Sequence, residues 1–280
     1  RRVTTDNDIV RAITNIYDCS PSDIRDDIKD FLISLYDYGI IMINGRYKEI
    51  TCKVSPSSPL NNPEDYEADL IAELKQHDQL YAATLEITYS CNEKCVHCYA
   101  NYPTLGPKSD QISINQYRKI IDELYEMQCM HLTFTGGDPF MNKDLLDIFR
   151  YARKKEFVCD FFTSGQYLAD HPDILHEIVS LRPKVFYISL YGSTAIIHDA
   201  ITRVPGSFCK TIATIEALRT AEVPVVANIM ILKQNCDDLR NIIALAKSLG
   251  VIYRISMSLI YRNDGSSDPM NYFVTDHVKI

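Results

Sequence analysis

The sequence constrains its fold most through an alternation of strand-like and helix-like segments that begins at residue 82. Short apolar runs rich in β-branched and aromatic residues predict strands at 83–88, 131–135, 158–163, 185–190, 224–231 and 251–258. Apolar residues at helical spacing predict helices near 114–127, 142–155, 171–180, 208–220 and 236–248. Because alternating βα units form parallel sheets, six of them predict an α/β fold, a partial (βα)6 TIM-like barrel. Functional side chains of such barrels gather at the C-terminal ends of the strands.

Three cysteines, Cys91, Cys95 and Cys98, lie in the loop that leaves the first predicted strand. Gaps this short allow three thiolates to reach one inorganic centre. A structural zinc site takes four protein ligands and an ordinary four-iron cluster takes four thiolates, so three ligands leave one metal position open for chemistry. The alternatives are three unrelated buried thiols, which rarely cluster in a core, and a zinc loop with His97 as the fourth ligand.

The spacing Cys-x3-Cys-x2-Cys, followed by Tyr99, resembles that of the radical S-adenosylmethionine (SAM) enzymes. The resemblance implies that Cys91, Cys95 and Cys98 hold a [4Fe-4S] cluster whose fourth iron is chelated by SAM. Reductive cleavage of SAM would then give a 5′-deoxyadenosyl radical that abstracts hydrogen from a substrate. It also implies that His97 and Tyr99 lie beside bound SAM, with His97 near the adenine.

Paired glycines follow the second predicted strand in the sequence Thr-Gly-Gly-Asp-Pro. Glycines at a strand end allow close approach of the backbone to a ligand, although they can also simply form a turn. The stretch resembles the Gly-Gly-Glu-Pro motif of the same family, whose backbone contacts the amino group of SAM. The resemblance implies a SAM-binding role for Gly136, Gly137, Asp138 and Pro139, with Asp138 replacing the usual glutamate.

The fourth predicted strand ends in Ile-Ser-Leu-Tyr-Gly, followed by His-Asp and by Thr-Arg-Val-Pro-Gly-Ser-Phe. This order resembles radical SAM peptide maturases that carry a SPASM extension. By that resemblance Ser189 contacts the ribose or carboxylate of SAM, and Arg203 pairs with the carboxylate as a bidentate fork. A surface ion pair is the alternative for Arg203. The same resemblance implies that Asn228, in the fifth strand, points toward the adenosine.

Two further parts of this segment are expected to be structural. His198 is interpreted as a structural or helix-start histidine rather than an acid–base group. Gly206 and Ser207 are interpreted as the cap of the helix that follows them.

Residues 1–51 are predicted to form a small winged-helix domain, with two helices followed by a hairpin at Asn44-Gly45. DNA binding is disfavoured because the second helix carries four aspartates against one arginine and one lysine. The segment resembles the PqqD-like peptide-recognition domain of radical SAM maturases, incomplete at its start; a purely structural module is the alternative. Residues 52–81 are expected to be a linker and a helix, and residues 82–260 the radical SAM core.

Composition limits the environment and the partners of the chain. The formal net charge of −8 argues against general affinity for nucleic acid or anionic membranes, and no apolar run approaches the roughly 20 residues that cross a bilayer. An odd set of nine cysteines, three of them clustered, indicates reduced thiols and a cytoplasmic protein. Residues 261–280 resemble the start of a SPASM-like extension, which we expect to be truncated here, with any auxiliary [4Fe-4S] clusters outside this segment.

The resemblance as a whole implies an enzyme that crosslinks a ribosomally made precursor peptide. Its partners would be that peptide, with its leader sequence, and an electron donor such as flavodoxin or ferredoxin. One alternative is a radical SAM maturase of a protein side chain or a small-molecule cofactor. Another is a winged-helix iron–sulfur transcription regulator. The sequence identifies no substrate-side acid or base.

Overall fold

The computed structural model describes residues 79–100 and 112–274, together with single positions nearer the N-terminus. The chain divides into two compact units, residues 1–62 and 63–280, and the second contains all the elements discussed below. The predicted winged-helix domain, the linker with its helix and the end of the C-terminal extension lie outside the described residues.

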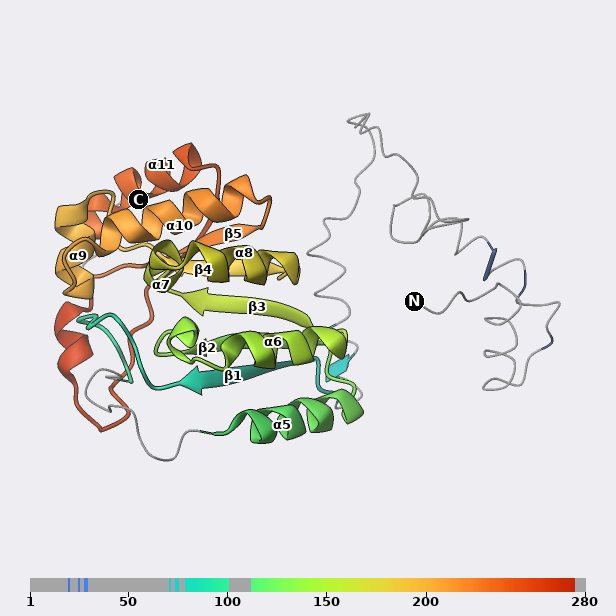
Figure 1. Cartoon of the computed structure of the whole chain (residues 1–280). Coiled ribbons are helices and arrows are strands. Elements are labelled where there is room, and N and C mark those ends of the chain that lie inside the picture. Colours follow the sequence, from blue (N-terminus) through green and yellow to red (C-terminus); the bar gives the residue numbers. More distant parts are fainter. Residues whose placement is uncertain are drawn as a thin grey trace. The chain divides into compact units, whose positions relative to one another are not determined.

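Six parallel strands form one sheet in the order of the sequence (Figure 1). They are β1 (Ala82–Thr88), β2 (His131–Gly136), β3 (Val158–Thr163), β4 (Val185–Ser189), β5 (Val225–Met230) and β6 (Ile252–Ser256). Each strand pairs only with its sequence neighbours within the described part of the chain, so β1 and β6 are its outer strands there. The α/β fold with a six-stranded parallel sheet is thereby confirmed and fits a partial barrel.

The crossover segments contain α5 (Ile114–Glu126), α6 (Leu145–Lys154), α7 (Gln166–Asp170), α8 (Pro172–Ser180), α9 (Ala195–Thr202), α10 (Ser207–Thr220) and α11 (Leu239–Ser248). Short 3-10 turns are η1 (Pro139–Met141), η2 (Cys236–Asp238) and η3 (Asp268–Tyr272). The five long helices were predicted, whereas the sequence reasoning missed α7 and α9, which are too short to show a full apolar period. The second predicted helix begins at 145 instead of 142 because η1 precedes it.

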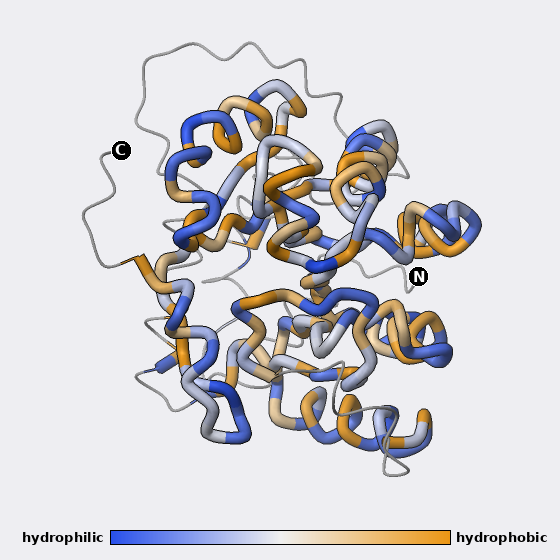
Figure 2. Tube along the Cα trace, turned by 90° about the vertical axis from the view of Figure 1, so that its left-hand side faces the viewer, coloured by the Kyte–Doolittle hydropathy of each residue, from blue (hydrophilic) through white to orange (hydrophobic). Residues whose placement is uncertain are grey.

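Local sequence explains where the helices start and which way they face. Ser113 begins α5 with a reciprocal capping box: its Oγ accepts the amide of Gln116, whose side-chain oxygen accepts the Ser113 amide at 2.8 Å. Apolar and polar residues then alternate along the helices (Figure 2). The helices pack their apolar sides against one face of the sheet and leave its other face uncovered by helices among the described residues (Figure 1).

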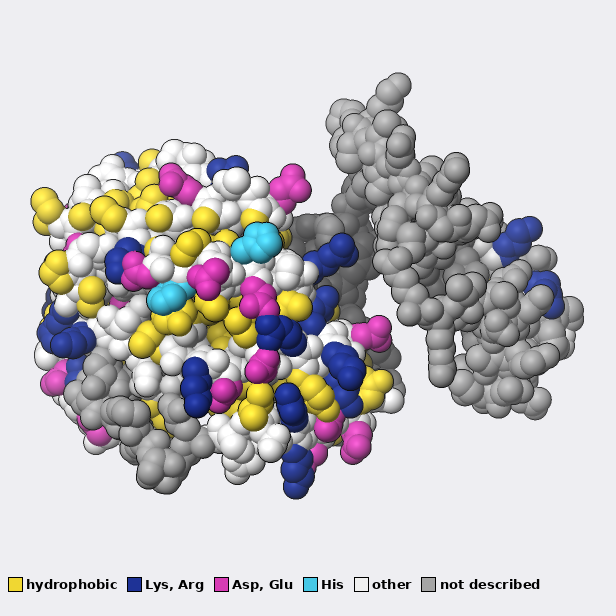
Figure 3. Space-filling view, viewed as in Figure 1, with side chains coloured by type: hydrophobic (Ala, Val, Ile, Leu, Met, Phe, Trp, Pro, Cys, Tyr) yellow, Lys and Arg dark blue, Asp and Glu magenta, His cyan; other side chains and the backbone are white. Residues whose placement is uncertain are grey.

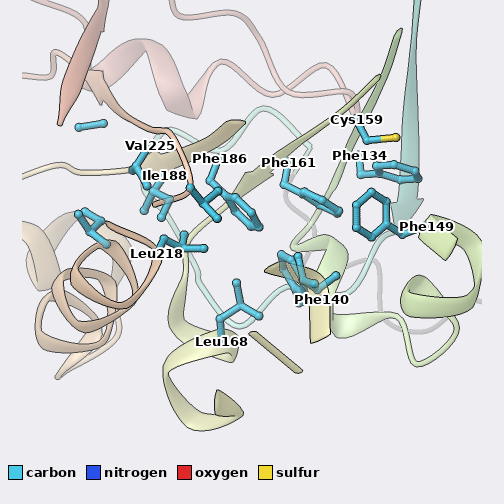
Figure 4. Packing of buried hydrophobic residues seen from close by; sticks show 14 of the residues in the cluster. Phe134, Phe140, Phe149, Cys159, Phe161, Leu168, Phe186, Ile188, Leu218 and Val225 are labelled. Atoms are coloured by element: carbon cyan, nitrogen blue, oxygen red, sulfur yellow. The ribbon is translucent and has the colours of Figure 1, made fainter. Parts of the chain in front are cut away.

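A ladder of phenylalanines fills the space between the sheet and the helices (Figure 4). Phe161 on β3 lies at its centre, with its ring 5.2 Å from that of Phe134, 5.0 Å from that of Phe186 and 5.0 Å from that of Phe149. All four rings are fully buried. Contacts of this kind add about 0.5–1.5 kcal/mol per pair to the gain from burial, so this face is the stability-determining side of the sheet.

The outer surface of the helices carries charges of both signs (Figure 3). Lysine, arginine, aspartate and glutamate side chains are interspersed over the face drawn in Figure 3, and the described residues form no continuous basic patch on that face. No helix in the described ranges is long and apolar enough to cross a membrane.

Candidate cofactor site

A cavity of about 250 Å³ opens at the C-terminal ends of the strands. Its wall combines the cysteine loop, defined here as residues 91–98, with residues from the ends of β2, β3, β4 and β5. Most of the residues that the sequence predicts for the site line it: Cys91, Cys95, His97, Cys98, Tyr99, Gly136, Gly137, Ser189 and Asn228. Asp138, Pro139 and Arg203 are the predicted site residues that lie outside this wall.

The C-terminal end of α9 positions the cysteine loop. The amide of Lys94 donates to the carbonyl of Thr202 at 2.9 Å, and the amide of Val96 donates to that of Ile201 at 3.0 Å. These bonds satisfy the last carbonyls of the helix, which have no partner within it. A helix that the sequence analysis did not predict therefore fixes the loop between its first and last cysteine.

Two of the three thiols lie where a bare thiolate is disfavoured. Burial raises the pKa of Cys91 and Cys95 well above that of an ordinary thiol, and the neighbouring carboxylate of Glu93 acts in the same direction on both. A thiolate trio in this place therefore needs a metal centre to balance its charge. Within the described ranges, no three His, Cys, Asp or Glu groups converge on a single ion. A structural zinc site takes four protein ligands, so three thiols fit a cluster with one open iron position better than a closed zinc site.

Gly136 and Gly137 allow the cysteine loop to lie against β2. A Cβ on Gly137 would overlap the carbonyl of Ser90 and come within 3.0 Å of the Cβ of Cys91. One on Gly136, where φ is +132°, would overlap the carbonyl oxygen of Thr88. The Gly137 amide donates to that same oxygen at 2.8 Å. The glycines thus have a packing role in addition to any contact with a ligand.

Asp138 is fully buried and acts as a hub between strand ends. Its Oδ2 accepts the hydroxyls of Thr163 and Ser164, both at 2.8 Å, and the Ser164 amide at 3.0 Å. Its Oδ1 accepts the amide of Phe140 at 3.1 Å, where Pro139 begins η1. Asp138 and Pro139 therefore support the cavity wall without lining it, and they could contact a ligand only through their backbone atoms.

His97 lies in the cavity wall with an unused polar atom. Burial lowers the pKa of His97 to about 4, so the ring is neutral at physiological pH. Its centroid is 4.8 Å from that of Tyr191, edge to face, and its Nδ1 has no hydrogen-bond partner within the described part of the chain. A neutral ring with a buried orphan nitrogen suits contact with a heteroaromatic ligand. Tyr99, at the same wall, donates its hydroxyl to Glu86 at 3.1 Å.

Ser189 and Asn228 lie side by side because β4 and β5 pair at these two positions. Arg203 lies elsewhere: it is exposed at the end of α9, in a left-handed conformation with φ of 57°, and donates to the Tyr272 hydroxyl at 3.3 Å. The structure therefore brings Ser189 and Asn228 together at the cavity and does not bring Arg203 to its wall.

His198 and Asp199 hold the chain around α9. His198 is buried, its pKa is lowered to about 4 by burial, and its Nδ1 accepts the amide of Tyr191 at 3.2 Å, which agrees with the structural interpretation. Asp199 accepts the amides of Gly206 and Phe208 at the start of α10; burial opposes its charge, yet these bonds hold its pKa below the usual value. The predicted cap is correct in place, but its capping carboxylate comes from Asp199.

The sequence analysis missed Glu93, which is buried between two of the cysteines. Its Oε2 accepts the thiol of Cys95 at 2.9 Å, and its Oε1 accepts the side-chain amide of Gln166 at 2.7 Å. Burial raises the pKa of Glu93 to about 7. The sequence signal that could have identified Glu93 was an acidic residue between two predicted cluster ligands.

Phe162 and Met230 also line the cavity, and the sequence analysis missed them as well. Strand alternation from Ser189 and Asn228 could have revealed them.

The fold and the site together define an α/β enzyme of the partial-barrel type, with a three-thiol cavity at the ends of its strands. The family model of the radical SAM superfamily matches residues 85–246, and the chain belongs to this superfamily. Members of the family use a [4Fe-4S] cluster and SAM. The three thiols of the cavity fit such a cluster.

The named relatives include a maturase, a bacteriocin biosynthesis protein and a heme synthase. The chain is 31% identical over 174 residues to the mycofactocin maturase MftC of Mycolicibacterium smegmatis, covering 62% of this chain and 43% of that protein. It is 26% identical over 238 residues to the subtilosin biosynthesis protein AlbA of Bacillus subtilis, covering 84% and 48%. It is also 29% identical over 167 residues to an AdoMet-dependent heme synthase of Methanosarcina barkeri, covering 60% and 47%. The chain spans about half the length of these relatives.

The solved structure of Streptococcus suis SuiB bound to its precursor peptide SuiA has a similar fold. The TM-score is 0.54 at 14% identity, over 82% of this chain and 52% of that one. At this identity the likeness concerns the fold alone.

Proposed function

We propose that this chain is the catalytic core of a radical SAM enzyme that modifies, by crosslinking, a ribosomally made precursor peptide. The observation that carries the proposal is a cavity lined by three thiols, with no fourth thiol among its described lining residues, and by backbone and polar groups from four strand ends. When bound, a [4Fe-4S] cluster supplies the electron that splits SAM into methionine and a 5′-deoxyadenosyl radical.

The residues of the chain would divide the work as follows. Cys91, Cys95 and Cys98 would hold the cluster and leave one iron for the amino and carboxylate groups of SAM. Gly136 and Gly137 would let the backbone approach the amino group. The other predicted SAM contacts are His97 and Tyr99 at the adenine end, with Ser189 and Asn228 at the ribose and adenosine. Asp138 and Pro139 would hold the glycine turn in place; Arg203 would reach SAM only after leaving Tyr272.

The peptide substrate is supported by the relatives. MftC and AlbA are named for maturation and bacteriocin biosynthesis, and SuiB was solved with a precursor peptide. We propose that the segment 1–51 is a PqqD-like recognition domain for the leader sequence and that a SPASM-like extension follows residue 260. An electron donor such as flavodoxin or ferredoxin would supply the reducing electron. Buried free thiols such as Cys129 and Cys159 suit a reducing cytoplasm.

Anaerobic reconstitution with iron and sulfide, followed by SAM, dithionite and candidate precursor peptides, tests this function. We expect 5′-deoxyadenosine to form and the mass of one peptide to fall by two hydrogens per crosslink. Deoxyadenosine without change in any peptide encoded near the gene would contradict the peptide assignment. Absence of deoxyadenosine from iron-loaded protein would contradict the chemistry itself.

The match to a heme synthase favours one second candidate, a radical SAM maturase of a small-molecule cofactor or protein side chain. Deuterium separates the two candidates: a peptide substrate labelled at its exchange-inert carbons transfers deuterium to deoxyadenosine only under the first. Transfer from a labelled porphyrin precursor, with none from peptides, would establish the second.

A further inference from the structure

A cationic side chain, that of Arg254, lies beside the cavity on the face of the sheet that the helices leave uncovered, called the inner face from here on. The proposed chemistry does not use this side chain. Arg254 is in β6, flanked by Tyr253 and Ile255, which pack toward the phenylalanine core. Since side chains alternate along a strand, Arg254 points to the opposite, inner face. It is exposed there, and no carboxylate in residues 79–100 or 112–274 forms an ion pair with it.

The guanidinium is held by two aromatic rings and one amide. Phe162 and Tyr187 stack with centroids 4.4 Å apart and planes at 14°. The central carbon of the Arg254 guanidinium is 5.4 Å from the Phe162 centroid and 5.1 Å from the Tyr187 centroid, within the range of cation–π attraction. Its Nε donates to Oδ1 of Asn228 at 3.3 Å. A long side chain fixed on three sides has already lost much of its rotamer freedom, which favours ligand binding.

The position of this group relates it to the cavity. Asn228 and Phe162 line the cavity, and Arg254 pairs with Asn228 across β5 and β6. Asn228 occupies Nε, and the two terminal nitrogens of the fork have no hydrogen-bond acceptor among residues 79–100 and 112–274, so they can donate to a ligand. A planar pair of N–H donors with a positive charge matches a carboxylate bidentately.

We propose that Arg254, on its Phe162–Tyr187 platform, binds a carboxylate of the substrate peptide next to the site of hydrogen abstraction. This inference rests on the proposed function and narrows the substrate class to peptides with an acidic side chain or a free C-terminal carboxylate at the modified position. The carboxylate of SAM is a competing source of the same chemistry. The iron that would chelate it belongs to the cysteine loop after β1, but the predicted SAM contacts Ser189 and Asn228 lie on β4 and β5, next to β6. The SAM affinity of R254Q therefore decides between the two sources.

The test uses the full chain and three N-acetylated tripeptides. Two are C-amidated, Ala-Glu-Ala and Ala-Gln-Ala, and the third is Ala-Ala-Ala with a free C-terminus. Each is titrated into arginine-labelled protein while the Nε–H resonance of Arg254, assigned by its absence in R254K, is followed by NMR. We expect at least one acidic peptide to bind about tenfold more tightly than the glutamine peptide, the gain typical of a charged hydrogen bond. Which acidic peptide binds distinguishes the side chain from the C-terminus.

The variant R254Q should remove this difference, whereas R118Q should keep it. Arg118 is a matched control because its guanidinium also lies over a ring, 5.6 Å from the centroid of Tyr151, but on helix α5. Equal binding of all three peptides to the parent, or a difference that survives in R254Q, would overturn the proposal. So would an R254Q protein whose SAM affinity falls as much as its peptide affinity. These titrations measure binding without turnover. A protein that prefers acidic peptides but modifies none of them would therefore contradict the proposed function and leave the Arg254 proposal standing.

Discussion

The two faces of the sheet use the same strands for opposite purposes. On the helix-covered face, Phe134, Phe161 and Phe186 of three successive strands are fully buried and stack on one another. On the inner face, Phe162 and Tyr187 stack as closely but stay partly exposed, with an arginine above them. Aromatic side chains therefore fill the core in one register and form the platform under Arg254 in the next.

This contrast teaches that strand alternation separates stability from function in this chain. Phe161 and Phe162 are adjacent in sequence and differ mainly in the face to which they point. A substitution on the outer face should reduce the free energy of unfolding, and one on the inner face should act chiefly on ligands.

The largest expected effect is that of F161A. Removing the central ring of the ladder should lower the free energy of unfolding by about 3–5 kcal/mol, because the void cannot close within four packed rings. F162A is the matched variant and should cost about 1–2 kcal/mol, since part of that ring already faces water. Urea unfolding followed by circular dichroism measures both. Equal losses would break the comparison between the two faces.

The next effect concerns the contact between β2 and the cysteine loop. G137A would force the Cβ of the new residue against the backbone of Ser90, so we expect a loss of about 1–3 kcal/mol and weaker iron binding. G265A is the control, because a Cβ on Gly265 meets nothing within 4 Å, although φ is +85°. Iron content after reconstitution separates them, with G265A retaining the iron of the parent. Full iron in G137A would show that the glycine is not needed for the loop.

The smallest predicted effect is a pH dependence. Unfolded histidine takes up a proton below a pKa of 6.5, whereas buried His198 stays neutral down to about 4. Unfolding therefore makes His198 take up a proton in this window, and the contribution of His198 to stability falls as pH falls from 7 toward 4. His198 should contribute about 1 kcal/mol of that loss by about pH 5.5.

The variant H198N checks this assignment, since an amide oxygen can still accept the Tyr191 amide. It should show a shallower loss of stability with acid, while H176N, at an exposed position of α8, keeps the slope of the parent. An unchanged slope in H198N would assign the pH dependence to other groups.

Much of the fold could be predicted from the sequence because parallel strands and long helices carry strong patterns. All six strands and five long helices were predicted, and the cysteines, the glycine pair, Ser189 and Asn228 do meet at one cavity. The strand ends and the cysteine spacing can be read from the sequence itself, whereas the glycine pair, Ser189 and Asn228 were singled out by their resemblance to the radical SAM family.

What could not be predicted depends on contacts between distant segments. Nothing local shows that Thr163 and Ser164 converge on Asp138, or that Gln166 reaches Glu93. The position of Arg203 depends on a left-handed turn at the end of α9, a helix too short for a periodic signal. Side chains whose partners lie tens of residues away need the fold before their roles can be stated.

The central claim is that Cys91, Cys95 and Cys98 together hold one cluster at which SAM is cleaved. Iron content and 5′-deoxyadenosine release, measured anaerobically on the parent and on C95A with C209A as the exposed-thiol control, test it most directly. The account predicts iron and deoxyadenosine from the parent and C209A, and neither from C95A. A C95A protein that binds iron and releases deoxyadenosine as the parent does would contradict it.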